Sequence, residues 1–406
     1  MSSEGGRTAA PSGSYRNTSL QQVIYGPGQL TTSLAKAIQE LGGTKALIMT
    51  GTSLATKTPV IRNVEAQLKE QGLYGATFTE IGQHAPVAGI RKASELMKSS
   101  KSDVLIAIGG GSPIDASKAV SFFHKKDTGA STFTPIIAVP TTLSVAETTA
   151  NAGYTSEEGH KIGVADPHLV PKIIIYDAEV SLHTPMQLWL STGIRALDHA
   201  IETLYRPLDM NLQRYNCLGA IRDLFTYLPA CKSDPENLSI RQRLFLAVFQ
   251  SLWPETRQGA LGLSHGLGHK IGATYGLAHG LCSCLTLARV IKYTAQSPDT
   301  PMEQLIALAD ALQFIPSPFN SSPAPLSAAP GALRLAAPSR QQLGKQGEQV
   351  ADAVQKLIDE IGCKTTLKSA KIPAEEIETI ATRETGPEKK DSKLWKDIVQ
   401  ILQDVA

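Results

Sequence analysis

The sequence predicts an α/β domain with a parallel sheet, followed by an all-α domain. Up to about residue 180, short apolar runs bounded by glycine or proline alternate with amphipathic segments, which is the pattern of repeated strand–helix–strand units. From about residue 185 onward the segments are longer, with helical periodicity and few strand signals. The chain of 406 residues also exceeds what one hydrophobic core usually serves, so we expect two domains with a cleft between them.

Four short apolar runs are the predicted strands of the first domain. A buried parallel strand is apolar on both faces, so it appears as a continuous run and not as an alternation. These runs are Ala46–Thr50, Val104–Ile108, Pro135–Val139 and Ile173–Tyr176. Between the first two lie the predicted helices Pro59–Gln71 and Val87–Met97, and Ala116–Phe123 is amphipathic as well. The first domain is therefore expected to alternate strand and helix.

The second domain is predicted to be built from helices alone. Five segments have apolar residues at helical spacing. They are Gln187–Tyr205, Cys217–Leu228, Ile240–Trp253, Leu261–Ile271 and Glu348–Ile361. We expect a flexible N-terminal tail over 1–20, the α/β domain over 21–183 and the helical domain over 184–406. Residues 315–338 are dense in proline, serine and alanine, which is typical of a surface loop or a disordered insertion.

Composition excludes several classes of protein. Lysine and arginine number 39 against 37 for aspartate and glutamate, so there is no broad positive field to hold a nucleic acid. The five cysteines are odd in number, and Cys282-x-Cys284 is not a zinc-ribbon spacing, which favours reduced, buried thiols. No secretory signal and no run of about 18 apolar residues is evident. We therefore expect a cytoplasmic protein that acts on small molecules and contacts no membrane.

A glycine-rich turn is the first chemical signal. Gly109-Gly110-Gly111-Ser112 follows the predicted strand Val104–Ile108 and opens an amphipathic segment. Without Cβ atoms the backbone can approach a pyrophosphate closely, and the amides at a helix start favour its negative charge. Pro140-Thr141-Thr142 follows the next strand, where open α/β sheets place ligand-binding loops. The two loops together predict a nucleotide site.

These residues resemble a known family. The glycine turn with Asp115 and Lys118, the Thr141-Thr142 pair with Glu147 and Thr149, and then Lys161 look like the first domain of iron-containing alcohol dehydrogenases, in the maleylacetate reductase-like branch. The resemblance runs from Tyr25-Gly26-Pro27-Gly28 to about Ala288, and weakly beyond. It implies a Rossmann-like domain and a helical domain (the dehydroquinate synthase-like fold), bound NAD(P)(H), and a homodimer. The cofactor residues that it implies are Gly51, Gly109, Gly110, Gly111, Ser112, Asp115, Thr141, Thr142, Thr149 and Lys161.

Two departures from the family pattern fall in this half. Thr50-Gly51-Thr52 follows the first strand, where members that prefer NAD often have an acidic residue for the ribose 2′-hydroxyl. Because no carboxylate there repels a 2′-phosphate, we expect NADP(H) to be tolerated. Val145-Ala146 stands where the family often has Gly-Ser, which removes a flexible backbone position and a hydroxyl from the cofactor loop.

Four histidines form the second chemical signal. His265 and His269 are four residues apart, as are Arg195 and His199, and residues at this spacing share a helix face. His279 follows ten residues after His269. A lone histidine on an apolar helix is usually a core residue, but four in three short segments favour a common site.

The resemblance gives three of these histidines the positions of metal ligands. In the family, an aspartate, a histidine four residues later and two further histidines fourteen positions apart hold a divalent metal. His199, His265 and His279 stand at the histidine positions, but Arg195 stands at the aspartate position. A guanidinium is a permanent cation without a lone pair to donate. Asp198 cannot simply replace the aspartate, because on a helix it points about 100° away from its neighbour His199.

Two hypotheses follow from Arg195, and metal loss is the favoured one. In it, the guanidinium of Arg195 takes over the electrostatic task of the metal, by polarising a carbonyl or by holding a substrate carboxylate in a bidentate pair. His199, on the same helix face, is a further candidate catalytic residue. In the other, His199, His265 and His279 still bind iron or zinc with a water molecule. Activity of metal-free protein separates the two.

His269 stands where the family has a histidine near the nicotinamide and the substrate, and an imidazole can carry the proton that accompanies hydride transfer. The leading hypothesis is therefore an NAD(P)-dependent reductase of a carbonyl or an activated double bond in a small, possibly carboxylated molecule. A lyase or isomerase on the same fold and a non-catalytic binding subunit remain as alternatives. Cofactor binding, and an absorbance change at 340 nm during turnover, would distinguish the three.

Overall fold

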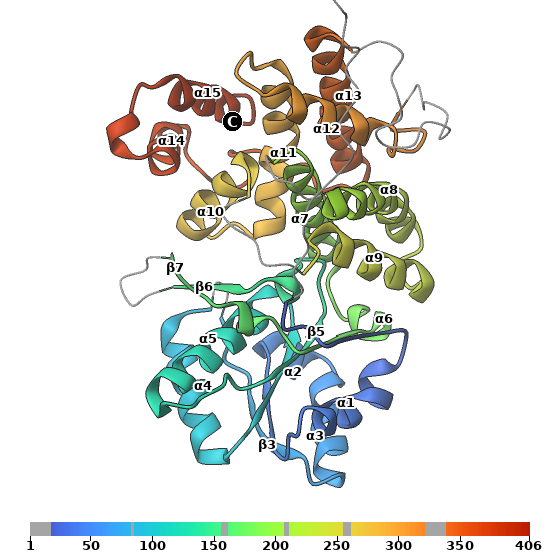
Figure 1. Cartoon of the computed structure of the whole chain (residues 1–406), viewed down its shortest axis with the longest axis vertical. Coiled ribbons are helices and arrows are strands. Elements are labelled where there is room, and N and C mark those ends of the chain that lie inside the picture. Colours follow the sequence, from blue (N-terminus) through green and yellow to red (C-terminus); the bar gives the residue numbers. More distant parts are fainter. Residues whose placement is uncertain (1–17, 83–84, 156–160, 207–210, 255–260, 321–337) are drawn as a thin grey trace, which may run out of the picture.

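The computed structural model describes residues 18–82, 85–155, 161–206, 211–254, 261–320 and 338–406. Figure 1 shows two halves stacked along the long axis of the molecule, a sheet with its helices below and a helical assembly above. Most of the predicted N-terminal tail and residues 321–337 of the predicted loop lie outside the described residues. Of the loop's described residues, Ile315 and Asn320 are buried, whereas Ser317 and Pro318 between them are exposed.

The sheet half contains six parallel strands in the order β1-β8-β5-β4-β2-β3. Their bounds are β1 Gln22–Tyr25, β2 Ala46–Met49, β3 Tyr74–Phe78, β4 Val104–Gly109, β5 Ile136–Pro140 and β8 Ile173–Tyr176. All four predicted strands are present. The two that the sequence did not reveal, β1 and β3, form the two edges of the sheet.

Helices cover both faces of this sheet. On one side lie α1 (Gln29–Glu40) and α3 (Val60–Glu70), and on the other α4 (Val87–Ser100) and α5 (Gly111–Thr128). Successive residues of a strand point to opposite faces. Leu47 and Met49 accordingly pack into the core beneath α4 and α5, whereas Ile48 packs beneath α1 and α3. This double burial explains why the strands appear in the sequence as continuous apolar runs.

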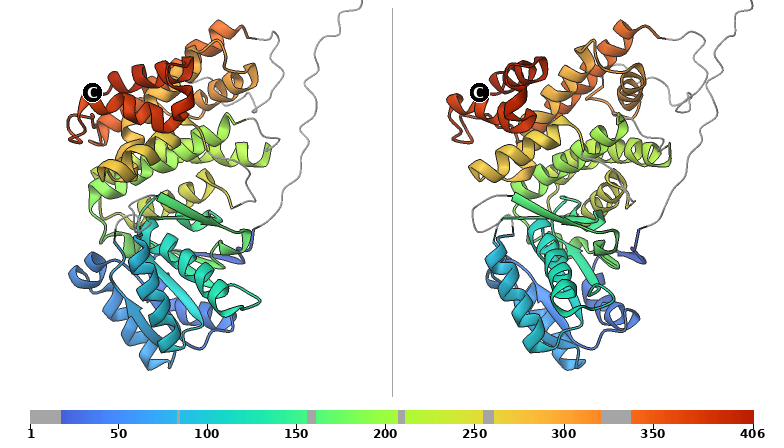
Figure 2. Two further views of the ribbon diagram at one scale, coloured as in Figure 1. Left: turned by 90° about the vertical axis from the view of Figure 1, so that its left-hand side faces the viewer. Right: turned by 60° about the vertical axis from the view of Figure 1, so that its left-hand side comes forward.

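Three short pieces complete the sheet half. They are α2 (Thr52–Lys57), α6 (Ala178–Ser181) and an antiparallel hairpin of β6 (Asn151–Thr155) and β7 (Lys161–Ala165). The hairpin lies between the sheet and the helical half (Figure 2). The sequence analysis did not predict it.

The second half is helical throughout its described residues, as predicted. Its α-helices are α7 Met186–Leu204, α8 Asn211–Ser233, α9 Leu238–Ser251, α10 Leu263–Tyr275, α11 His279–Gln296, α12 Met302–Leu312, α13 Arg340–Glu360, α14 Ile377–Thr385 and α15 Lys393–Gln403. Predicted segments correspond to α7, α8, α9, α10 and α13. Helices α7 and α9 begin one and two residues before the predicted bounds, and α8, α10 and α13 extend farther beyond them. Among the described residues, no helix is both long enough and apolar enough to cross a membrane.

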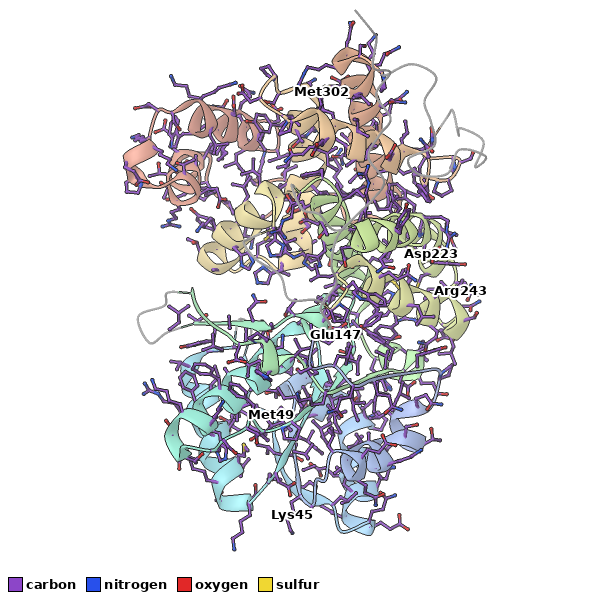
Figure 3. All side chains as sticks on the ribbon, viewed as in Figure 1. Lys45, Met49, Glu147, Asp223, Arg243 and Met302 are labelled. Carbon is purple, nitrogen blue, oxygen red and sulfur yellow. The ribbon has the colours of Figure 1, made fainter. Side chains whose placement is uncertain are left out.

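The two halves meet where β5 ends and α7 begins. Thr184 Oγ1 donates to the carbonyl of Thr141 at 2.6 Å, and the Leu143 amide donates to Thr192 Oγ1 at 3.1 Å. Figure 3 shows Glu147 at this junction, between the sheet below and the helices above. The loop after β5 is therefore fastened directly to the first helix of the second half.

Candidate active site

The carboxyl ends of three neighbouring strands gather most of the predicted cofactor residues. Strands β2, β4 and β5 are adjacent and parallel, so the residues that follow them lie along one edge of the sheet. Gly51 follows β2, Gly110 follows β4, and Thr141 with Thr142 follows β5. The Thr141 amide donates to the carbonyl of Gly109 at 2.9 Å, which joins the second and third of these loops.

The glycine turn has a shape that side chains would obstruct. Gly109 has φ +148°, and a Cβ there would lie 2.8 Å from Pro113 Cγ. A Cβ on Gly110 would lie 3.1 Å from Thr142 Cγ2, whereas one on Gly111 would meet nothing nearer than 3.7 Å. Helix α5 starts at Gly111 without a side-chain cap from Gly110. Its first amides, including that of Ser112, are therefore available to an anion.

Lys118 ties α5 to the segment before the hairpin. Its side chain is fully buried, and Nζ donates to the Ala146 carbonyl at 2.6 Å, to Thr149 Oγ1 at 2.8 Å and to the Asn151 carbonyl at 3.0 Å. Asp115 Oδ1 lies 3.7 Å away. Burial lowers the pKa of Lys118, and the Asp115 charge opposes this. Thr149 and Asp115, both predicted cofactor residues, thus serve at least to hold this lysine.

Glu147 is a buried carboxyl at the junction. It accepts a hydrogen bond from the Tyr176 hydroxyl at 2.7 Å, and burial raises the pKa of Glu147 to about 7. Val145, two residues earlier, has φ +63°, a left-handed conformation that is costly for a β-branched residue. The loop therefore keeps the backbone conformation that a glycine would adopt easily, although valine occupies the position.

Gly51 and Lys161 are the two remaining predicted cofactor residues. Gly51 precedes α2 with an extended φ of −93°, a conformation open to any residue. Lys161 begins β7, but its side chain lies outside the described part of the structure.

The four histidines lie in a row across three helices. Ring centroids are 5.2 Å apart for His199 and His265, 4.6 Å for His265 and His269, and 5.4 Å for His269 and His279. His199 is on α7, the next two are on α10, and His279 is the first residue of α11. The helical spacing in the sequence thus leads to one cluster of imidazoles, which we call the imidazole row.

Arg195 reaches this row from α7. Its Nη2 lies 3.0 Å from His265 Nε2. Because a guanidinium can only donate, His265 must accept with Nε2 and be neutral in this contact. Burial, followed by the charge of Arg195, lowers the pKa of His265 well below its usual range. Arg195 therefore uses the lone pair of one of the three predicted metal ligands.

A buried carboxylate lies on the other side of the guanidinium. Asp198 Oδ2 accepts from Ser283 Oγ at 2.6 Å and from Ser264 Oγ at 3.2 Å, and it lies 3.4 Å from Arg195 Nη1. Ser283 Oγ also lies 3.2 Å from that Nη1. Burial raises the pKa of Asp198, and the charge of Arg195 and the two hydroxyl donors oppose the rise. Asp198 contacts the arginine and thereby balances its charge within the helical half.

Glu202 fixes the start of α10. Its two carboxyl oxygens accept from the backbone amides of Ser264 and His265 at 2.7 and 3.2 Å. A Cβ on Gly262 would lie 2.6 Å from Glu202 Oε1, so this glycine admits the carboxyl. Burial, followed by the charge of Asp198, raises the pKa of Glu202 well above its usual range.

Sequence reasoning missed Glu202, Ser264 and Ser283. One signal was available for the first of them, because Arg195, His199 and Glu202 are spaced by four and then three residues and therefore share a helix face. The two serines had no such signal. They are distant in sequence from Asp198 and meet it only because α7 packs against α10 and α11.

Comparison with known proteins shows the family of the chain. Residues 21–178 match the family model "Iron-containing alcohol dehydrogenase", and residues 189–404 match that of the C-terminal domain of the same family. The chain belongs to the iron-containing alcohol dehydrogenase family. It is accordingly an oxidoreductase of the dehydrogenase and reductase kind.

Individual relatives agree with this assignment. The maleylacetate reductase of Rhizobium sp. (strain MTP-10005) is 28% identical over 295 residues, which cover 72% of this chain and 78% of that protein. The NADPH-dependent butanol dehydrogenase of Clostridium saccharobutylicum is 27% identical over 318 residues, which cover 74% and 78%. The crystal structure of the Rhizobium reductase has a TM-score of 0.74 at 22% identity, and the match covers 97% of this chain and 98% of that one. The last comparison shows a shared fold.

The family name implies iron, so we tested the residues at the ligand positions for a fit. Within the described residues, no group of three or more histidine, cysteine, aspartate or glutamate side chains is arranged to hold a metal. Arg195 stands where the resemblance implies the fourth ligand, and its Nη2 donates to His265 Nε2. A cation that occupies one ligand's lone pair repels a divalent ion. As arranged, these residues do not fit a metal ion.

Proposed function

We propose that this protein is an NAD(P)-dependent reductase of small carboxylated molecules, acting on a carbonyl or an activated double bond without a metal ion. The observation that carries the proposal is the contact of Arg195 Nη2 with His265 Nε2 at 3.0 Å. It puts a permanent cation among the imidazoles, at the sequence position where the family has an anionic metal ligand. Maleylacetate reductases among the relatives support a carboxylated substrate.

The edge formed by the glycine turn fits a nicotinamide dinucleotide. The amides of Gly110, Gly111 and Ser112 would bind the pyrophosphate, and Thr141 and Thr142 lie beside them on the next loop. Bound NAD(P)H supplies a hydride. Thr50-Gly51-Thr52 has no carboxylate to repel a 2′-phosphate, and a relative is named as NADPH-dependent, so we expect NADPH to be accepted.

Arg195 is assigned to the carboxylate of the substrate. Its guanidinium has five donors in a planar fork that suits a carboxylate. Only part of this fork is used by Asp198, Ser283 and His265. In a site of low dielectric constant such a contact both binds and orients an anionic substrate.

His269 is assigned to the proton. Reduction of a carbonyl adds a hydride at carbon and leaves an oxygen that must take up a proton. His269 is half-buried in the middle of the imidazole row, between His265 and His279. An imidazole there can donate a proton to that oxygen and recover one through its neighbours.

The proposal is tested with protein from which metal has been removed by a chelator, and in which its absence has been verified by mass spectrometry. NADPH oxidation is followed at 340 nm with 2-oxo acids and unsaturated oxo-dicarboxylates, and with uncharged ketones of the same size as controls. We expect full activity without metal and a preference for the charged compounds.

Strict dependence on added iron or zinc contradicts the metal-free mechanism. NADPH binding with no absorbance change across these substrates would favour the lyase alternative, and no NADPH binding would favour a non-catalytic protein.

A further inference from the structure

Behind the imidazole row, Arg195 is held from the side opposite His265. Its Nη1 faces Asp198 Oδ2 at 3.4 Å and Ser283 Oγ at 3.2 Å. Asp198 and Ser283 are each 0% exposed, and Arg195 is 5% exposed. They come from α7 and α11, two helices in extensive contact.

We propose that Asp198 and Ser283 are positioning residues that aim the guanidinium of Arg195 at the substrate carboxylate. The proposal rests on the proposed function, because it names the groups that set the geometry of the same carboxylate site. Neither residue needs to touch the substrate. Both act through Arg195.

The direction of the Ser283 hydrogen bonds follows from chemistry. A hydroxyl has one proton to donate, and the 2.6 Å contact with the Asp198 carboxylate is the shorter and stronger use for it. The lone pairs of Ser283 therefore face Arg195 Nη1, which donates. Asp198, Ser283 and Nη1 form a closed triangle in which each hydrogen bond fixes the direction of the next.

This triangle sets where the rest of the guanidinium points. The group is planar and rigid, so holding Nη1 on one side and Nη2 at His265 on the other fixes both its position and its plane. The α10 backbone also approaches it closely, because a Cβ on Gly268 would lie 3.2 Å from Nη1. An arginine on a flexible stem thus becomes a fixed donor.

Charge balance alone does not explain the arrangement. If Asp198 served only to neutralise Arg195, any nearby carboxylate would suffice and Ser283 would have no role. Ser264 provides a matched comparison, because it also donates to Asp198 at 3.2 Å and is also fully buried. Of the two serines, only Ser283 has a hydrogen bond to Arg195 among the described residues.

The experiment compares Ser283→Ala with Ser264→Ala. Calorimetry measures the binding of succinate, a dicarboxylate that cannot accept a hydride, to protein saturated with NADPH, and succinamide serves as its uncharged counterpart. We expect Ser283→Ala to weaken succinate binding about tenfold, the scale of one charged hydrogen bond, and Ser264→Ala by less than about threefold. Succinamide binding should change little in either variant. Ser283→Thr, which keeps the hydroxyl, should restore most of the loss.

The outcomes separate this inference from the function on which it rests. If wild-type protein binds succinate no better than succinamide, the carboxylate substrate is wrong and the inference fails with it. If wild-type protein prefers succinate and Arg195→Leu abolishes that preference, but both serine variants bind as wild type, the proposed function stands and the positioning role is wrong. Equal losses of succinate affinity in the two serine variants, together with equal losses of thermal stability, also contradict the positioning role.

Discussion

The glycine turn and the group of Arg195 and the imidazole row arrange their polar groups in different ways. In the sheet half the groups are backbone amides at the start of α5, next to Gly109, Gly110 and Gly111, which have no side chains. In the helical half they are the imidazole row and the guanidinium of Arg195, which Ser283 on α11 and His265 on α10 hold by hydrogen bonds. The first arrangement depends on the absence of a side chain at Gly109 and Gly110, where a Cβ would lie 2.8 and 3.1 Å from its nearest neighbour. The second depends on hydrogen bonds between side chains of different helices.

This difference shows where a family site can change its chemistry. A backbone cradle depends on few side chains, so the pyrophosphate site proposed for the glycine turn offers little room for a change of chemistry. A side-chain site can replace a metal ligand by a cation, provided that a partner such as Asp198 balances the charge. Four experiments would break or sharpen this comparison.

The largest change is expected from Arg195→Asp. It restores the family's anionic ligand beside His199, His265 and His279 and removes the cation that repels a metal. We expect this variant to bind about one zinc ion per chain, since structural zinc sites are four-coordinate, with a higher melting temperature when zinc is present. Elemental analysis after dialysis and thermal unfolding with and without zinc measure both effects.

Arg195→Leu is the control, because it removes the cation without adding a ligand and should stay metal-free. A zinc-free Arg195→Asp variant would mean that the histidines cannot converge on a metal. Stoichiometric metal in purified wild-type protein would contradict the role given to the arginine.

His269→Ala should lower kcat by about two to four orders of magnitude, the usual effect of removing a general acid or base, with the fold intact. Steady-state NADPH oxidation and circular dichroism measure the two quantities. His168→Ala, in the sheet half and exposed, should leave the rate unchanged. A wild-type rate in His269→Ala would remove this histidine from the mechanism.

Glu147 should make stability depend on pH. Its pKa is raised from 4.5 to about 7 in the folded protein, so the folded state binds the proton more tightly than the unfolded chain. The resulting stabilisation is complete below about pH 4.5 and is lost as pH rises to about 7, a change of about 3 kcal/mol in the free energy of unfolding at most. Lys118, Asp115 and Tyr176 are the ionisable groups that act on it.

Glu147→Gln keeps an acceptor for Tyr176 and cannot titrate. As pH rises from 4.5 to 7.5, the free energy of unfolding of wild type should therefore fall relative to that of this variant. Urea denaturation measures both values. Glu303→Gln, at an exposed position, is the control and should show no such shift. A pH-independent difference would mean that Glu147 does not titrate in this range.

The smallest effect is expected in the glycine turn. Gly110→Ala creates a contact of 3.1 Å with Thr142, whereas the nearest contact for Gly111→Ala is 3.7 Å. With φ −79° at Gly110 alanine causes no backbone strain, so only the crowding matters. We expect NADPH to bind about tenfold more weakly to Gly110→Ala and nearly normally to Gly111→Ala, in fluorescence titrations. Equal affinities would show that the turn tolerates a methyl group.

Much of the fold could be predicted from the sequence because burial leaves a clear pattern. Strands such as Val104–Gly109 are buried on both faces and appear as apolar runs. The edge strand β1 is only partly buried, and it pairs with β8 about 150 residues later, so nothing local marks it. Helix α15 did have a signal that was not used, since Trp395, Ile398 and Ile401 recur at helical spacing and are buried.

Only those contacts of the candidate site that follow from helical spacing could be predicted from the sequence. Residues four apart brought Arg195 and His199 to one face of α7, and His265 and His269 to one face of α10, and the structure brings these faces together. The triangle of Asp198, Ser283 and Arg195 depends on the packing of α7 against α11, which no local pattern encodes. The roles assigned to these residues stay predictions.

The hydrogen bond from the Leu143 amide to Thr192 Oγ1 has a mechanical consequence. It joins the loop beside the glycine turn to α7 only three residues before Arg195, about 4.5 Å along the helix axis. If one half rotates relative to the other and this hydrogen bond is kept, the rotation axis must pass close to the bond. The arginine then hardly moves relative to the β5 loop, while helices far from the junction, such as α13, travel farther.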